Sequence, residues 1–227
     1  MCFSAEASFG ASIVLAVVGT IAVRKVDVRS QLPFAFIPFI FAFQQFSEGI
    51  LWLSFHHEDL FFLRTISTYT FLIFAQIVWP TWVPISILLL EKEANRKKML
   101  YITLGCGILL SSYLAYCYLF YDVKAEVSNH HIQYDLHFPH TAHYLWLTGL
   151  FYFIPTVIST IISSVPRMRI LGLIILLSCL LTRMFTLNYF ISIWCFFAAI
   201  ISVMVAFIMS GLHKSTRWTE WFSKLRS

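Results

Sequence analysis

Charged side chains are scarce in this sequence of 227 residues. Asp, Glu, Lys and Arg make up 12% of it, whereas 59% of the residues are hydrophobic and 18% are aromatic. So small a charged fraction cannot cover the surface of a water-soluble globule, which excludes that class of protein. The composition therefore predicts a protein that is surrounded by lipid.

Several chemical motifs are also missing. The five cysteines form no CxxC pair and four of them lie within apolar runs, so no disulfide framework is expected. There is no HExxH sequence, and no internal repeat is evident. The opening MCFSAEA has no basic region and no cleavage site, so we expect the first apolar run to be retained.

The sequence does contain seven apolar runs. Because a helix needs about 20 apolar residues to cross a bilayer, each run is close to one membrane span. Alternation typical of strands is not sustained, and Pro80 and Pro84 are expected to kink the third run without ending it. The prediction is an all-α polytopic protein with a seven-helix transmembrane domain at 1–212 and an amphipathic cytoplasmic interfacial tail at 213–227. The runs cover 8–23, 33–55, 65–90, 99–121, 143–164, 169–187 and 189–212.

Basic residues mark one side of the membrane. Thirteen of the 16 Lys and Arg residues lie in, or directly border, the gaps after the first, third and fifth runs or lie in the C-terminal tail. The positive-inside rule then places the N-terminus outside and the C-terminus in the cytoplasm, as the odd number of runs also requires. The expected location is the inner (cytoplasmic) membrane. The net charge of +5 indicates contact with membrane lipids and not with nucleic acid, and the sequence does not specify an oligomeric state.

The second run carries an acidic residue inside the membrane. Gln45 and Glu48 are three residues apart and therefore share one face of a helix. A carboxylate at this depth is costly against lipid, so Glu48 should point into the bundle, with Arg183 of the sixth run as its expected partner. Two interpretations stay open: a structural ion pair, or, together with Gln76 in the third run, a polar path for substrate or protons.

Seven of the eight histidines lie on the side opposite the basic gaps. Two of them, at the start of the fifth run, are three residues apart and would share a helix face. Imidazole, carboxylate and thiolate groups are ligands of divalent metals such as zinc, although a solvated histidine-rich loop is the plainer alternative. The candidate metal ligands are His140, His143, His56, His57 and Cys2, with Glu6 as a nearby acid.

Several short segments resemble a known family. The opening MCFSAEASF, the LPF at 32–34, and QQFSEG at 44–49 followed by LWL at 51–53 are similar to an uncharacterised family of small multi-span bacterial membrane proteins that begin Met-Cys-Phe-Ser-Ala. The resemblance implies an integral membrane protein and brings no activity with it. It also implies that Cys2, Ser4, Glu6, Gln45 and Glu48 belong to one signature.

Three hypotheses for function follow. In the first, a divalent transition metal activates water against a lipid-derived or small periplasmic substrate, with Glu48 or Glu6 as a ligand or catalytic general base. In the second, the intramembrane polar residues serve a transporter or sensor. In the third, they only hold helices together, so the sequence leaves open whether the protein is an enzyme. In the first hypothesis the metal ligands are His140, His143 and one of His56 and His57.

Overall fold

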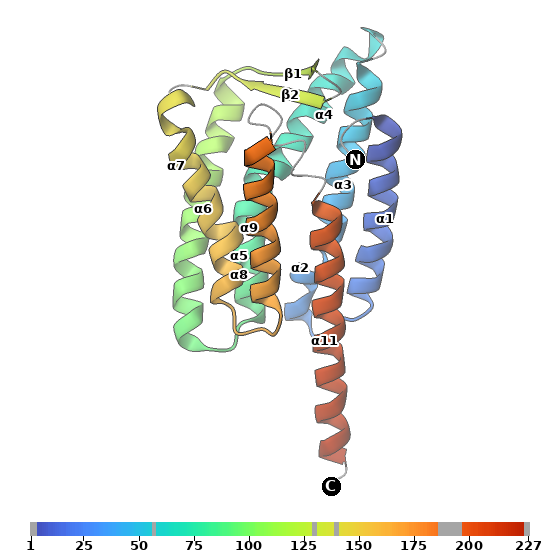
Figure 1. Cartoon of the computed structure of the whole chain (residues 1–227), viewed down its shortest axis with the longest axis vertical. Coiled ribbons are helices and arrows are strands. Elements are labelled where there is room, and N and C mark those ends of the chain that lie inside the picture. Colours follow the sequence, from blue (N-terminus) through green and yellow to red (C-terminus); the bar gives the residue numbers. More distant parts are fainter. Residues whose placement is uncertain (1–3, 56–57, 129–130, 139–140, 186–196, 225–227) are drawn as a thin grey trace.

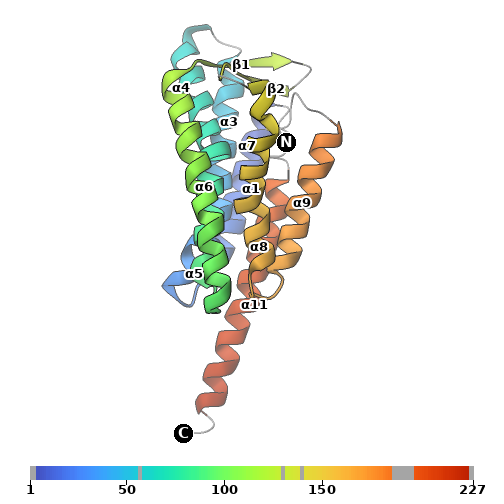
Figure 2. The same cartoon turned by 90° about the vertical axis from the view of Figure 1, so that its left-hand side faces the viewer.

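The computed structural model is a bundle of helices closed at one end by a two-stranded sheet (Figures 1 and 2). It describes residues 4–55, 58–128, 131–138, 141–185 and 197–224; of these, the side chains of 58, 141–146, 182–185, 198–199 and 214–224 are outside the description. We call the end that carries the sheet the hairpin end. The opposite end, beyond which the C-terminal helix extends, is the tail end.

The first half of the chain runs down, up, down and up the bundle (Figure 1). Its elements are α1 (Ala5–Val23), η1 (Arg29–Gln31), α2 (Leu32–Ala35), α3 (Ile37–Ser54), η2 (Glu58–Leu60), α4 (Phe61–Leu72), η3 (Ile73–Val78), α5 (Trp79–Leu90) and α6 (Ala94–Phe120). The second half starts with the sheet and continues with helices. It contains β1 (Val123–Ser128), β2 (His131–Leu136), α7 (Thr141–Phe153), η4 (Ile154–Ile158), α8 (Ser159–Ile162), α9 (Met168–Phe185) and α11 (Ala198–Lys224).

Four segments of the described chain are long and apolar enough to cross a membrane: Ala5–Val23, Arg29–Ser54, Phe61–Leu90 and Ala94–Phe120. Shorter apolar helices cover Leu147–Ile162, Met168–Leu181 and Ile200–His213. Ile13, Ile102 and Leu109 are each about two-thirds exposed, which is a surface suited to lipid and not to water. The chain is therefore a helical, multi-pass membrane protein.

Helix α3 is the central helix of the first half. In the span Arg29–Ser54, which contains α3, 61% of the most apolar stretch is buried inside the protein, against 28% for α1, which packs beside it. Glycines permit the close approach of the two helices, because a Cβ atom on Gly19 or Gly49 would lie within 3 Å of the rings of Phe39 and Phe9. A polar residue on the inner face of α3 is thus enclosed on several sides.

The segment Phe61–Leu90 stays helical through two prolines, as the sequence predicts. The helix accommodates the prolines with a π-helical stretch, η3, directly before α5. Pro84 has no N–H that could donate to the carbonyl group of Pro80. Gly107 of α6 packs directly against that carbonyl: a Cβ atom added to Gly107 would lie 1.9 Å from the carbonyl oxygen. The two helices therefore touch backbone to backbone at this point.

Other helices supply hydrogen bonds to η3. The Ser111 hydroxyl of α6 donates to the carbonyl oxygen of Ile77 at 2.8 Å, and the Tyr152 hydroxyl of α7 donates to that of Ala75 at 2.7 Å. Within lipid, a backbone carbonyl without a partner is costly. The irregular backbone is tolerated here because neighbouring side chains satisfy it.

The sheet corrects the expectation of an all-helical fold with an open histidine-rich connector. β1 and β2 pair antiparallel, with Val123 opposite Leu136 and Ser128 opposite His131. Ile132 is fully buried in a cluster with Leu51 and Trp52 of α3. The alternation of Ile132, Tyr134 and Leu136 with polar residues is the period-two signal of a half-buried strand. Three apolar positions were too short a pattern to stand out among apolar helices.

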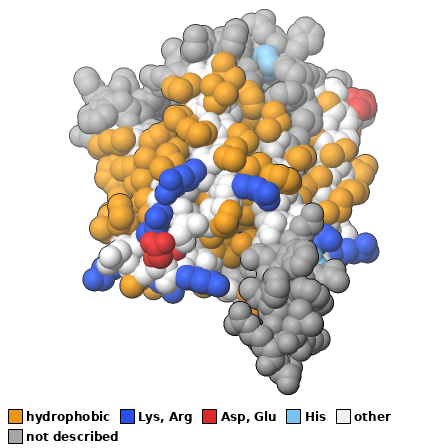
Figure 3. Space-filling view, turned by 60° about the horizontal axis from the view of Figure 1, so that its bottom comes forward, with side chains coloured by type: hydrophobic (Ala, Val, Ile, Leu, Met, Phe, Trp, Pro, Cys, Tyr) orange, Lys and Arg blue, Asp and Glu red, His pale blue; other side chains and the backbone are white. Residues whose placement is uncertain are grey.

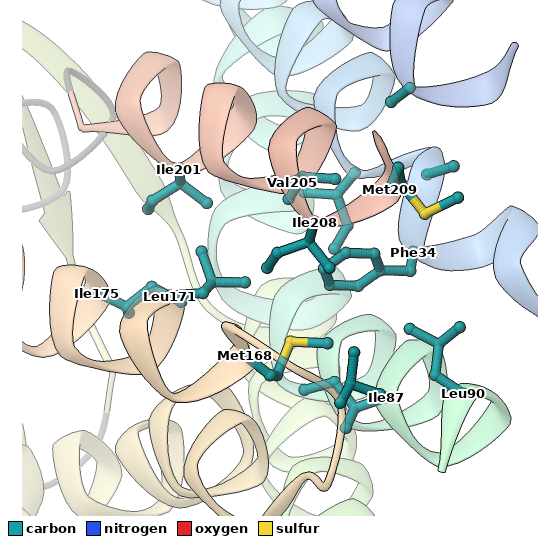
Figure 4. Close-up of a cluster of buried hydrophobic side chains, with 14 of the residues drawn as sticks. Phe34, Ile87, Leu90, Met168, Leu171, Ile175, Ile201, Val205, Ile208 and Met209 are labelled. Atoms are coloured by element: carbon teal, nitrogen blue, oxygen red, sulfur yellow. The ribbon is translucent and has the colours of Figure 1, made fainter. Parts of the chain in front are cut away.

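One apolar core joins the tail-end halves of several helices. Figure 4 shows side chains of α11 directed toward those of α2, α5 and α9. This cluster includes Phe34, Ile87, Met168, Leu171, Ile201, Val205, Ile208 and Met209. α11 itself continues as one helix to Lys224 and extends past the rest of the bundle (Figures 1 and 2). The predicted domain boundary at residue 212 therefore does not coincide with a helix end, and the division into 1–212 and 213–227 stays a prediction.

Glu91 fastens two loops together at the tail end. Its carboxylate, 2% exposed, accepts hydrogen bonds from the backbone N–H and the hydroxyl of Ser164 at 2.7 and 2.6 Å, and from the backbone N–H groups of Lys92 and Glu93. Burial raises the pKa of Glu91, but these hydrogen bonds outweigh it and lower the pKa to about 2. The charged carboxylate is thus a fixed structural element.

Two further polar contacts lie at the same end. Arg96 of α6 donates to the carbonyl oxygen of Ile162 at 2.6 Å. The ring of His213 in α11 lies 2.7 Å from the carboxylate of Asp27, which follows α1. Lys and Arg side chains gather around this end, while hydrophobic side chains cover the visible flank of the bundle (Figure 3). The polar groups of the tail end therefore connect segments that are distant in sequence.

Candidate functional site

The candidate site is a buried polar pair on α3. Glu48 is fully buried and Gln45, one turn earlier, is 1% exposed. The Gln45 side-chain Nε2 donates to Oε2 of Glu48 at 3.1 Å. The sequence analysis expected these two residues on one inward face of the helix, and that expectation is confirmed.

The pair lies in the half of α3 nearer the hairpin end. Glu48 is six residues before the last helical residue, Ser54, which corresponds to about 9 Å along the axis. Trp52 follows one turn later on the same face and packs with Ala5 of α1 and Ile132 of β2. The β-hairpin and the start of α1 thus cover the end of the helix beyond the pair.

Gln44, next to the pair, has a different role. Its Oε1 accepts a hydrogen bond from the Trp79 indole Nε1 at 2.9 Å, and the Trp79 ring stacks on Phe41 with centroids 4.0 Å apart. This contact ties α3 to α5. The sequence analysis missed it, although a second glutamine beside Gln45 in an apolar run was a visible signal.

The amide of Gln45 is only half satisfied. Its Nε2 faces the carboxylate of Glu48, because an amide oxygen in that position would meet the carboxylate oxygen. Its Oε1 is buried and has no hydrogen-bond partner among the described residues. Most buried polar atoms in proteins are paired, so this acceptor is unusual.

Gln76, the third residue of the predicted polar path, is bonded to another helix. It belongs to η3, is half-buried, and accepts a hydrogen bond at its Oε1 from the Tyr118 hydroxyl of α6 at 2.7 Å. The contact joins neighbouring helices, as the hypothesis that the polar residues only hold helices together expects. Gln76 thus forms a second polar position at the η3–α6 interface.

Arg64 is a further cation that the sequence analysis did not single out. It donates through Nη2 to the carbonyl oxygen of Ser54 at 2.7 Å, and its guanidinium lies over the ring of Phe55 at 4.9 Å. A positive charge at the C-terminal end of a helix interacts favourably with the helix dipole. Arg64 thereby fixes the end of the helix that carries Gln45 and Glu48.

Most of the predicted metal ligands are not among the residues that the structure describes. This is the case for Cys2, His56, His57 and His140, and for the side chains of His143 and Arg183, whose backbones belong to α7 and α9. Glu6 is exposed in the first turn of α1. Among the residues that the structure describes, no three His, Cys, Asp or Glu side chains are grouped to hold a metal ion. The metal site and the Glu48–Arg183 pair therefore stay predictions.

Comparison with known proteins gives a family and no activity. No match was found among curated proteins or among solved structures. The model of a family of unknown function (DUF6629) matches residues 1–220, which includes α1, the polar pair on α3, the hairpin and most of α11. The expected membership in an uncharacterised family is confirmed, and the chain belongs to the DUF6629 family.

Proposed function

We propose that this protein is a seven-span protein of the inner membrane whose outward half contains a polar site organised by Glu48. The observation that carries the proposal is the fully buried carboxylate of Glu48, held by Gln45 inside a membrane-spanning segment. Burying an acidic group in a span is costly, and such groups commonly mark substrate or proton sites. The substrate we propose is a lipid-derived or small periplasmic molecule.

The orientation rests on charge. The tail end carries Arg24, Lys25, Arg29, Lys92, Arg96, Lys97 and Lys98 among other basic residues, and Figure 3 turns this end toward the viewer. The positive-inside rule makes it the cytoplasmic end. The hairpin end, with the Glu48 half of α3, then faces outward.

The reaction we favour is metal-assisted hydrolysis. The histidine-bearing segments follow α3 or lie between β1 and α7 in the sequence, and the end of α3, the hairpin and the start of α7 are at the hairpin end, as is the start of α1 (Figure 1). His140, His143 and one of His56 and His57 would hold the metal, because imidazole is a good ligand of zinc. A bound zinc ion would supply a water of lowered pKa. Glu48 or Glu6 would accept the proton from that water or complete the ligand set.

Elemental analysis of detergent-purified protein tests the proposal. We expect about one zinc-class ion per chain, retained through dialysis and lost on replacing His140 and His143 together with Ala. His213→Ala is the matched control, since His213 lies at the tail end against Asp27 and should leave metal content unchanged. Metal content near zero in the native protein, or unaffected by the double replacement, would remove the metal from the proposal.

A transporter or proton path is the second candidate. It is favoured by the half-buried Gln76, bonded to Tyr118 in a π-helical segment, since such segments are frequent at functional sites. In this case Glu48→Gln would abolish uptake or a proton current in proteoliposomes while the protein contains no metal. Hydrolysis without any flux would exclude it.

A further inference from the structure

We infer that the free acceptor of Gln45 is a recognition point for a hydrogen-bond donor, and that the site therefore takes an amphiphile with a hydroxyl or amine group on an apolar chain. The inference rests on the proposed outward-facing site and names its substrate class. It starts from the 1% exposed Gln45, whose Oε1 has no partner among the described residues.

The neighbouring glutamine shows why this atom matters. Gln44 and Gln45 are adjacent on α3 and equally buried, each 1% exposed. The Oε1 of Gln44 is occupied by the indole of Trp79, whereas the Gln45 amide is anchored through its nitrogen, and its oxygen has no partner in the described part of the chain. An unpaired buried acceptor is costly to the folded protein unless something else donates to it. A ligand donor would remove that cost on binding.

The surroundings determine the rest of the ligand. Gln45 lies within an apolar span, and Leu51 and Trp52, further along α3, are buried among apolar side chains. A ligand that reaches Oε1 from the membrane must have an apolar body and only a small polar group. Hydroxyl and amine groups both supply a donor, and both occur on lipid-derived molecules.

Discrimination against a methylated analogue is the expected consequence. A site that is built to accept a hydrogen bond rejects an analogue without the donor, because the protein acceptor is left unpaired again. We expect the purified protein in detergent to bind 1-dodecanol at least about tenfold more tightly than dodecyl methyl ether. Dodecylamine should exceed dodecyltrimethylammonium in the same way. Isothermal titration, with empty micelles as the blank, measures both ratios and shows which donor is preferred.

Two variants test whether the preference for the alcohol over the ether arises at Gln45. Gln45→Met keeps the size of the side chain without the acceptor, so the alcohol-to-ether ratio should fall to about one. Gln44→Met is the matched control. It removes the bond to Trp79 and lowers the melting temperature, but it should keep the ratio. Equal binding of alcohol and ether by the native protein overturns the inference even if neither variant folds, and so does a ratio that persists in Gln45→Met.

The same protein preparation separates this inference from the proposed function. If the protein as purified contains no metal but still binds the alcohol and the amine selectively, the inference is supported and the proposal of metal-assisted hydrolysis is excluded. Stoichiometric metal without donor selectivity overturns the inference and leaves the hydrolase proposal in place.

Discussion

The two ends of the bundle use polar residues in opposite ways. At the tail end, three polar side chains have partners in other segments: Glu91 has Ser164, Arg96 has the carbonyl of Ile162, and His213 has Asp27. In the half toward the hairpin end, the side-chain oxygen of Gln45, beside the buried carboxylate of Glu48, has no hydrogen-bond partner within the segments that the structure describes.

This difference in the pairing of polar groups indicates that the tail end has a structural role and that the pair on α3 has a functional one. Fully paired polar groups at the tail end stabilise loops that would otherwise be free, and they have no capacity left for a ligand. A buried amide whose oxygen has no partner among the described residues contributes little to stability for its cost. We therefore expect replacements at the tail end to reduce stability, and replacements of the α3 pair to reduce binding more than stability.

Glu91→Gln should give the largest loss of stability. The pKa of Glu91 is about 2 in the folded protein against an ordinary value of 4.5, a difference that corresponds to about 3 kcal/mol in favour of the charged form. We expect the neutral amide to lower the free energy of unfolding by about this amount, measured by reversible unfolding in mixed micelles. Glu93→Gln is the control, since its side chain is 57% exposed. Equal stability of the two variants would break the comparison between the ends.

The pH dependence has a defined sign. Because the folded protein lowers the pKa of Glu91, its contribution is complete above pH 4.5 and is lost as the pH falls toward about 2. The difference in unfolding free energy between the native protein and Glu91→Gln should shrink over that range. A difference that is constant between pH 5 and pH 2.5 would show that the carboxylate charge is not what fastens the loops.

Ile132→Ala probes the hairpin end and should have a smaller effect. Ile132 is fully buried against Leu51 and Trp52, so its truncation should cost about 2 kcal/mol in the docking of the hairpin. Hydrogen exchange of the backbone amides of 123–136 should become faster, while the core around Phe34 at the tail end is unchanged. Val127→Ala, opposite Ile132 in the sheet but 46% exposed, is the control. Uniformly faster exchange in the whole chain would mean that the hairpin is not a separable unit.

His213→Ala should have the smallest effect. The pair with Asp27 is partly exposed, with 26% and 18% of the two side chains accessible, and pairs of this kind contribute at most about 1 kcal/mol. The melting temperature should therefore change by no more than a few degrees. A loss comparable to that of Glu91→Gln would show that α11 is held mainly by this contact and not by the apolar core of Figure 4.

Properties that follow from local pattern could be predicted from the sequence. The apolar runs locate the long helices, and the spacing of Gln45 and Glu48 correctly places both on the buried face of α3. The continuity of Phe61–Leu90 through Pro80 and Pro84 was also predictable, because bundle neighbours commonly satisfy the freed carbonyls.

Properties that depend on contacts between segments could not be predicted. Nothing in the local sequence indicates that Glu91 accepts bonds from Ser164, 73 residues away. Nor does it indicate that Trp79 donates to Gln44, while the oxygen of Gln45 has no partner among the residues described. The hairpin lies between these cases. Its alternation is present over 131–136, but the pairing that makes it a strand comes from β1.

The hydrogen bonds to η3 have a consequence for the order of assembly in the membrane. The carbonyls of Ala75 and Ile77 take their bonds from Tyr152 and Ser111, which leave the ribosome later than the segment that they complete. During synthesis this segment must enter the bilayer before the hydroxyl groups that donate to its two carbonyl oxygens have been made. We therefore expect Phe61–Leu90 to insert as a metastable helix that reaches its final conformation only when α7 has arrived.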